Sequence, residues 1–195
     1  MHHLGHVFLA AGPPPFQFGA FIADGVRGPT FRALPSVVQA GVAFHRWVDW
    51  QTDRHSAFRA ARALLRPYAG RYAGLIVDLW LDVVLGQHWK DFLPHESLST
   101  FTERFIRETV RPWRAYAPLS WSAFLQALEE ENLLLRFGSP EGMKAHLTRF
   151  VERRELPLQS HQVLDGLERH EAELEELLRT FWNEAHRWRR WGPTE

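Results

Sequence analysis

Cysteine is absent from the 195-residue chain, and this absence excludes several kinds of structure and chemistry. The protein can form no disulfide bond and can offer no thiolate to a metal ion or a substrate. A serine in a Gly-x-Ser-x-Gly elbow is also missing. If the protein catalyses hydrolysis, the nucleophile is therefore expected to be an activated water molecule rather than a side chain.

Net charge and long apolar runs are lacking as well. The 23 basic and 23 acidic side chains cancel, so no overall field favours nucleic acid or a membrane surface as a partner. The longest apolar stretch, YAGLIVDLWLDVVLG, is too short to span a bilayer and carries two acids. No Lys or Arg precedes the short apolar run in MHHLGHVFLAAGPPP, which is unlike a signal peptide. We expect a cytoplasmic protein and leave its oligomeric state open.

Segments in which apolar residues recur with helical periodicity make up most of the sequence. The 45% hydrophobic and 13% aromatic content argues against disorder, and the length suits one domain. No segment alternates as a strand does. We therefore predict an all-α helical bundle that forms a single domain over residues 1–195. Its predicted helices are 16–25, 35–51, 55–65, 69–90, 97–115, 120–136, 140–154 and 158–189.

Proline, glycine and serine mark the predicted ends of these helices. Pro67 and the WGPT stretch at 191–194 are expected to lie in turns. Ser120 is expected to cap the helix that follows it. Ser139, followed by Pro140, is typical of another helix start.

Helix 69–90 carries two acids that its surroundings do not explain. Its centre reads LIVDLWLDVVL, in which nine of eleven residues are apolar and surround the helix, so it is predicted to lie in the core. Asp78 and Asp82 nevertheless stand four residues apart on one face. A buried carboxylate must be paired, protonated or bound to a cation. These acids either bind a metal ion, line a water-filled crevice, or contact arginines and helix N-termini.

The segment FHRWVDWQTDRH, residues 44–55, supplies a second polar face. His45, Asp49 and Asp53 recur every four residues, and the aromatic side chains of the segment are expected to pack on the opposite face. Asp24 ends another apolar run, FGAFIADGVRG. One imidazole and several carboxylates, without sulfur, suit Mn²⁺, Mg²⁺ or Fe²⁺ better than structural Zn²⁺. His6 either joins this predicted metal site or is an ordinary N-terminal histidine.

These motifs together resemble a known family. GAFIADGVRG, AGVAFHRWVDWQTDRH and YAGLIVDLWLDVVLGQHW, in this order and spacing, look like the acyl carrier protein phosphodiesterases. ALEEENLLLRFGSPEGMKAHLTRFVERR is similar to the C-terminal half of that family, so the resemblance covers nearly the whole chain. It implies a fold related to the HD-type metal phosphohydrolases and an enzyme that prefers Mn²⁺. The implied reaction is hydrolysis of the phosphodiester between 4′-phosphopantetheine and a serine of holo acyl carrier protein.

The resemblance also implies roles for particular side chains. We expect Asp53 to orient the attacking water, and Arg46 either to hold a phosphate oxygen or to form a structural ion pair. The positions that match the family's metal-binding or phosphate-binding residues are Asp24, His45, Asp49, Asp53, Asp78 and Asp82.

The sequence departs from the family pattern at two positions. Ala20 stands where the family often has Asn, and Val83 stands where it typically has His. His88, further along the same helix, either compensates for the missing imidazole or is a surface histidine at the helix end. The Val83 departure keeps two alternatives open. One is hydrolysis of another phosphate ester, such as a nucleotide, and the other is binding of a carrier protein without turnover.

An arginine-rich stretch follows the His/Asp segment. RHSAFRAARALLRPYAGR places Arg59, Arg62 and Arg66 on one helical face. Because acyl carrier proteins are acidic, this face is a candidate surface for steering the implied partner. The alternative is a solvated basic face without a partner.

Overall fold

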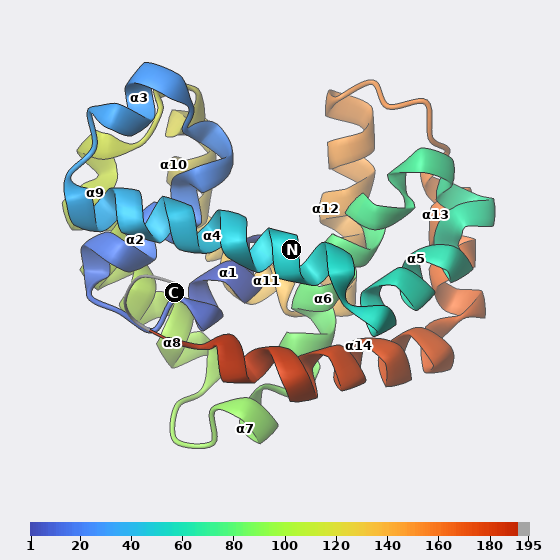
Figure 1. Cartoon of the computed structure of the whole chain (residues 1–195). Coiled ribbons are helices and arrows are strands. Elements are labelled where there is room, and N and C mark those ends of the chain that lie inside the picture. Colours follow the sequence, from blue (N-terminus) through green and yellow to red (C-terminus); the bar gives the residue numbers. More distant parts are fainter. Residues whose placement is uncertain (191–195) are drawn as a thin grey trace.

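Helices form the whole architecture of residues 1–190, the part of the chain that this computed structural model describes (Figure 1). That part contains no β-strand, only an isolated bridge between Ala10 and Arg190, so the all-α prediction is confirmed. The single-domain boundary at residue 195 stays a prediction, because residues 191–195 lie outside the described part. The helices are α1 (His3–Leu9), α2 (Pro14–Ile22), α3 (Gly28–Arg32), α4 (Ser36–Arg54), α5 (Ser56–Ala69), α6 (Ala73–Gln87), α7 (Trp89–Phe92), α8 (Leu98–Phe105), α9 (Arg111–Trp113), α10 (Ser122–Glu131), α11 (Leu133–Phe137), α12 (Pro140–Arg153), α13 (Ser160–Arg169) and α14 (Glu171–Ala185).

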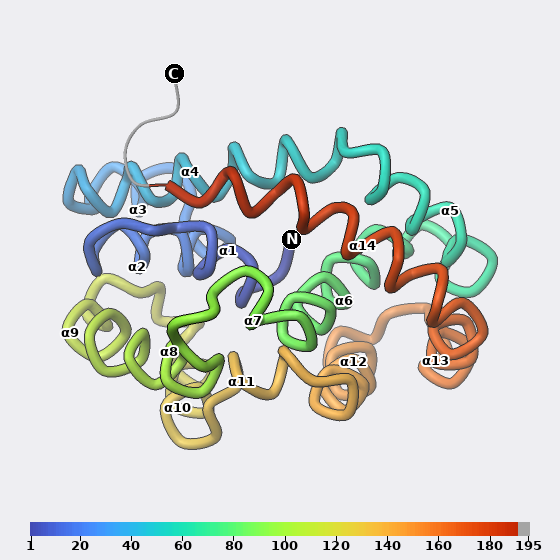
Figure 2. The backbone as a smooth tube through the Cα atoms, turned by 90° about the horizontal axis from the view of Figure 1, so that it is seen from below, coloured from blue at the N-terminus to red at the C-terminus, as the bar shows by residue number. Residues whose placement is uncertain are grey.

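Helix α6 lies among other helices in the middle of the molecule, as its apolar sequence predicts (Figure 2). It packs against α1, α5, α11, α12 and α14. Val77, Leu81 and Leu85 on α6 are fully buried. They belong to one hydrophobic cluster that extends from Leu4 to Ala185. None of the helices among the described residues has the length and apolar character needed to cross a bilayer.

Two glycines bring α2 and α4 into direct backbone contact. A Cβ atom on Gly19 would lie 2.0 Å from the Val38 carbonyl oxygen, and one on Gly41 would lie 2.0 Å from the Phe16 carbonyl oxygen. Only glycine allows this approach, because any side chain at either position would clash with backbone. The contact places the end of α2, where Asp24 follows, beside the middle of α4.

Several predicted boundaries are wrong in ways that local chemistry explains. Pro67 does not end a helix but lies exposed in the last turn of α5, where the loss of one hydrogen bond is tolerated. Ser120 lies in the 3₁₀ turn Leu119–Trp121 and does not cap α10. The predicted helix 158–189 breaks at His170 into α13 and α14. Helices α1 and α3 were not predicted at all.

Other boundary predictions are confirmed or fall outside the described part. Ser139 caps α12, because its hydroxyl oxygen accepts a hydrogen bond from the Gly142 amide at 3.1 Å. The predicted helix 97–115 is interrupted by a π-helical turn, Ile106–Val110. The turn predicted at 191–194 lies outside the described residues.

Candidate metal centre

Helix α4 presents His45 and Asp49 on one face, as their spacing predicts. The His45 Nε2 atom lies 3.1 Å from the Asp49 Oδ2 atom, and His45 is only 2% exposed. On the other side of the ring, Nδ1 donates a hydrogen bond to the Ala20 carbonyl oxygen at 2.8 Å. A backbone carbonyl that fixes one ring nitrogen and leaves the other for a ligand is typical of metal-binding histidines.

His6, from α1, completes a compact group with these two residues. Its Nε2 atom lies 3.0 Å from Asp49 Oδ1, and its ring stacks on that of His45 with centroids 3.5 Å apart. His6 is buried, and its Nδ1 atom has no hydrogen-bond partner among the described residues. One ligand atom each from His6, His45 and Asp49 lie within 4.8 Å of one another, so the three residues could hold a metal ion.

Asp24 approaches this group from the turn after α2, Ala23–Gly25. Its Oδ1 atom lies 3.4 Å from His45 Nε2, and its side chain is 64% exposed. The next residue of α4, Arg46, holds the same turn from outside, because it donates a hydrogen bond to the Val26 carbonyl oxygen at 3.0 Å. The Arg46 guanidinium also lies over the Phe31 ring, 5.2 Å from its centroid. Among the described residues Arg46 does not form the structural ion pair considered for it; its contacts are to the Val26 backbone and the Phe31 ring.

Asp78 and the N-terminal ammonium group of Met1 lie at the opposite side of Asp49. The ammonium nitrogen is 2.7 Å from Asp78 Oδ1 and 3.2 Å from Asp49 Oδ1. The Asp78 Oδ1 atom is itself buried, although the side chain as a whole is 29% exposed. The ammonium group and the carboxylates of Asp49 and Asp78 thus form an ion-paired group beside His6 and His45.

Asp82, in contrast, is turned toward α1 and not toward this group. It is fully buried, and its two oxygens accept hydrogen bonds from the backbone amides of Leu4 and Gly5, at 2.9 and 2.8 Å. The Oδ2 atom also lies 2.8 Å from His2 Nδ1. Asp82 thus satisfies the free amides at the start of α1, which was one of the alternatives for the acids of α6.

Asp53 and His88 lie apart from the compact group. Asp53 is exposed at the end of α4 and close enough to Asp78 for its negative charge to help raise the pKa of Asp78, a shift caused mainly by burial. His88 lies at the end of α6, where its Nε2 atom is 3.1 Å from Glu175 Oε1 of α14. This is the helix-end position considered for His88. In that position His88 does not take the compensating role considered for it, because Val83, where the imidazole is missing, is fully buried in the core.

The aromatic residues of segment 44–55 divide between core and surface. Phe44 is buried and stacks with Trp47, which in turn contacts Trp188. Trp50, however, is 50% exposed, with the Arg54 guanidinium 3.9 Å from its ring centroid. The prediction that all of these rings pack opposite the metal site is therefore wrong for Trp50.

The protonation states in this group depend on burial and on the close carboxylates. Burial opposes protonation of His45, but its hydrogen bonds with Asp24 and Asp49 outweigh it and raise the pKa of His45 to about 9. Burial, reinforced by the neighbouring His45, lowers the pKa of His6 to about 3. Burial would raise the pKa of Asp49, but hydrogen bonds from His45 and His6 lower it. His6 is therefore neutral and Asp49 ionised at neutral pH, which are the forms that bind metals.

A second group of imidazoles beside Asp82 was missed in the sequence. His2 lies with its ring centroid 4.5 Å from that of His3 and 5.5 Å from that of His146, on α12. His3 packs against Phe21 and Phe124. The three histidines in MHHLGH were the available signal, but only His6 was singled out.

The comparisons with known proteins agree with the resemblance of the motifs. A family model described as acyl carrier protein phosphodiesterase matches residues 1–185. A protein of that name from Escherichia coli O6:H1 is 30% identical over 154 residues, 79% of each chain. Others are from Yersinia pestis, 26% identical over 182 residues (93% of this chain and 94% of the relative), and from Serratia proteamaculans, 37% identical over 105 residues (53% and 54%). No solved structure matches the chain.

Proposed function

This chain belongs to the acyl carrier protein phosphodiesterase family, and we propose on that basis that it hydrolyses holo acyl carrier protein. The bond cleaved is the phosphodiester that joins 4′-phosphopantetheine to a serine of the carrier. The oxygen of a water molecule forms a bond to phosphorus, the bond from phosphorus to the serine oxygen breaks, and the serine oxygen leaves with a proton. The products are apo carrier protein and 4′-phosphopantetheine.

The compact group of His6, His45 and Asp49 carries this proposal. Its ligand atoms lie within 4.8 Å of one another, and Asp24 and Asp78 adjoin it. Two imidazoles and several carboxylates fit a divalent ion that accepts nitrogen and oxygen ligands, and Mn²⁺ is our choice over Mg²⁺ and Fe²⁺.

We assign different roles to the residues around such an ion. When bound, a divalent ion lowers the pKa of water and neutralises charge on the phosphoryl group. We assign metal binding to His6, His45 and Asp49, with Asp24 and Asp78 beside them. Asp53, exposed at the end of α4 and close to Asp78, is assigned to orienting the water. The Arg46 guanidinium donates one N–H to the Val26 carbonyl oxygen, and we assign its other N–H groups to binding a phosphate oxygen.

Asp82 has a positioning role in this proposal instead of the metal-binding role expected from its spacing. Its carboxylate holds the start of α1 through the Leu4 and Gly5 amides. Because His6 directly follows Gly5 on α1, Asp82 sets where that imidazole stands relative to His45. We also propose that the protein is cytoplasmic, because the cytoplasm is the compartment in which it would meet its substrate.

Conversion of holo to apo carrier protein, followed by intact mass in the presence of Mn²⁺, tests the function. We expect a mass loss equal to phosphopantetheine with the wild type and none with Asp49→Asn. Asp165→Asn, an exposed change on α13, is the matched control and should keep full activity. Full activity of Asp49→Asn would refute the site. No mass loss with the wild type would refute the substrate, and phosphate release from nucleotides would then identify another phosphate ester.

A further inference from the structure

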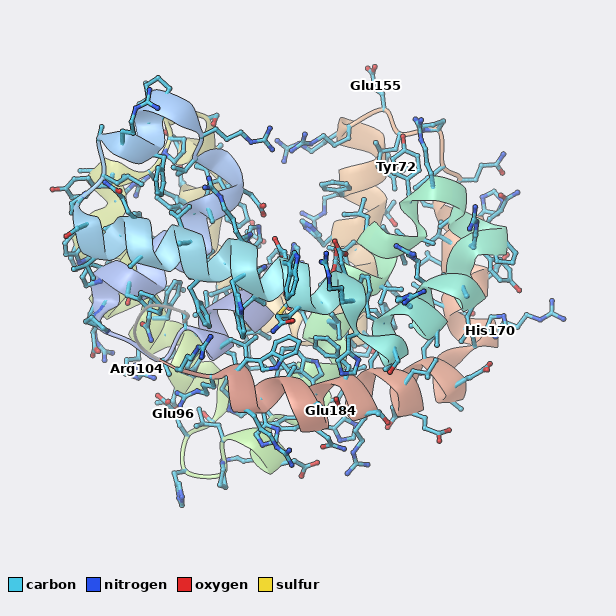
Figure 3. The ribbon with its side chains drawn as sticks, in the orientation of Figure 1. Tyr72, Glu96, Arg104, Glu155, His170 and Glu184 are labelled. Atoms are coloured by element: carbon cyan, nitrogen blue, oxygen red, sulfur yellow. The ribbon has the colours of Figure 1, made fainter. Side chains whose placement is uncertain are left out.

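Four arginines line a hollow on the surface formed by α5 and the start of α6. The hollow has a volume of about 690 Å³, and its lining includes Arg59, Arg62, Arg66, Arg71 and Ala73. In Figure 3, Tyr72 lies above α5 near the N-terminal end of α6, next to this surface. Arg71 donates a hydrogen bond to the Tyr72 hydroxyl at 2.8 Å.

Among residues 1–190, no acidic side chain pairs with the arginines of this hollow. The described residues that line it include no acid. Within residues 1–190, the side chains of Arg59, Arg62 and Arg66 form no ion pair and no hydrogen bond, and all three are exposed. The chain as a whole has a net charge of zero, so this concentration is local. Such a surface attracts an anionic partner and repels a basic one.

The hollow lies close to the candidate metal centre along α6. A Cβ atom on Gly74 would lie 3.5 Å from Arg62 Cδ, so Arg62 covers this point of α6. Asp78 follows Gly74 by four residues and therefore lies on the same face, about 6 Å further along the helix axis. Asp78, which adjoins the candidate metal centre, is thus one helical turn of α6 from the point that Arg62 covers.

We propose that this hollow docks an acidic surface segment of the carrier protein beside the modified serine, an inference that rests on the proposed function. The bond to be cleaved lies at the protein end of the phosphopantetheine arm, so the carrier surface itself must come within a few atoms of the metal centre. The basic hollow, whose Arg62 lies over α6 one helical turn before Asp78, is where that carrier surface would make contact. The hollow is open and its arginines are long and exposed. It therefore suits a protein surface better than a small anion, which would need an enclosed site.

Binding of the apo carrier protein, without metal and without turnover, tests this docking surface directly. We expect the triple variant Arg59→Glu, Arg62→Glu, Arg66→Glu to bind labelled apo carrier at least tenfold more weakly than the wild type. The matched control is Arg32→Glu, Lys90→Glu, Arg107→Glu, which changes the net charge equally at exposed positions outside the hollow. It should bind within about twofold of the wild type.

Two further measurements keep the test independent of folding and of catalysis. The three arginines are also changed to Gln, and a carrier variant with Lys in place of acids near the serine is added. That carrier variant should regain affinity for the triple Glu variant, which shows that the variant is folded. Equal binding of wild type and triple variant, or an equal loss in the control, would overturn the inference. If apo carrier binds at the hollow but holo carrier is not hydrolysed, the docking surface stands and the proposed function fails.

Discussion

The two ring nitrogens of His45 have different roles: one contacts the backbone of the fold and the other faces the proposed metal site. Its Nδ1 atom is held by the Ala20 carbonyl, and its Nε2 atom faces Asp49 at 3.1 Å and Asp24 at 3.4 Å. The ring is therefore oriented before any ion binds, which reduces the cost of ordering it on metal binding. The same two carboxylates favour a proton on Nε2, so proton and metal compete for one atom.

This competition predicts a pH dependence of metal affinity. The pKa of His45 is raised to about 9, so below that pH the proton is bound and a metal must displace it. The affinity for Mn²⁺ should therefore rise with pH, by about tenfold for each unit if one proton is released. Calorimetric titrations with Mn²⁺ at about pH 6.5 and 8.5 measure this slope. His45→Gln should bind weakly with a smaller slope, and a flat wild-type profile would contradict the assignment.

Asp78 and Asp82 show what the spacing of residues can and cannot predict. The spacing correctly places both on one side of a core helix, and the burial of Asp82 correctly predicts that it needs partners. Which acid faces the metal group depends on α1, whose amides occupy Asp82. Helix α1 has no capping side chain at its start. The position of α1 is set by the hydrogen bond from Gly5 to Asp82, which lie 77 residues apart in sequence. No local sequence pattern reveals such a contact.

At the scale of elements, the contact of α2 with α4 positions Asp24 against His45. Gly19 and Gly41 are the points of closest approach, where a Cβ atom would meet a carbonyl oxygen at 2.0 Å. The two helices were predicted from their apolar pattern, although α4 extends beyond the predicted 35–51 to Arg54. Their close packing was not predicted, because glycine within a helix indicates a contact without naming its partner.

Substitution of these glycines tests the role of the helix contact. Gly19→Ala and Gly41→Ala should each lower the free energy of unfolding by about 1–3 kcal/mol through overpacking. Both should also weaken Mn²⁺ binding, because the helices must separate and move Asp24 away from His45. Denaturant titration and calorimetry measure the two effects. Gly74→Ala is the control, since its nearest contact would be a side-chain atom at 3.5 Å, and it should be neutral or stabilising. Equal stability of all three variants would contradict this account.

At the scale of the whole molecule, the candidate site gathers α1, the end of α2, α4 and α6 around one point. Three of these four segments were predicted, and they contribute Asp24, His45, Asp49 and Asp78. The fourth, α1, contributes His6, which the sequence marked only as an optional member. Long helices with strong periodicity were predictable, whereas a seven-residue helix without a cap depends on the rest of the fold. The HD-type relationship of the fold stays a prediction.

The most direct test of the account is the position of Mn²⁺ in a crystal structure of the protein grown with that ion. Anomalous diffraction at the manganese absorption edge locates the ion without assumptions about its ligands. We predict an anomalous peak coordinated by His6, His45 and Asp49, with Asp24 or Asp78 adjoining it. A peak at His2 and Asp82 instead, or no peak in crystals of an active protein, would contradict the proposed metal centre.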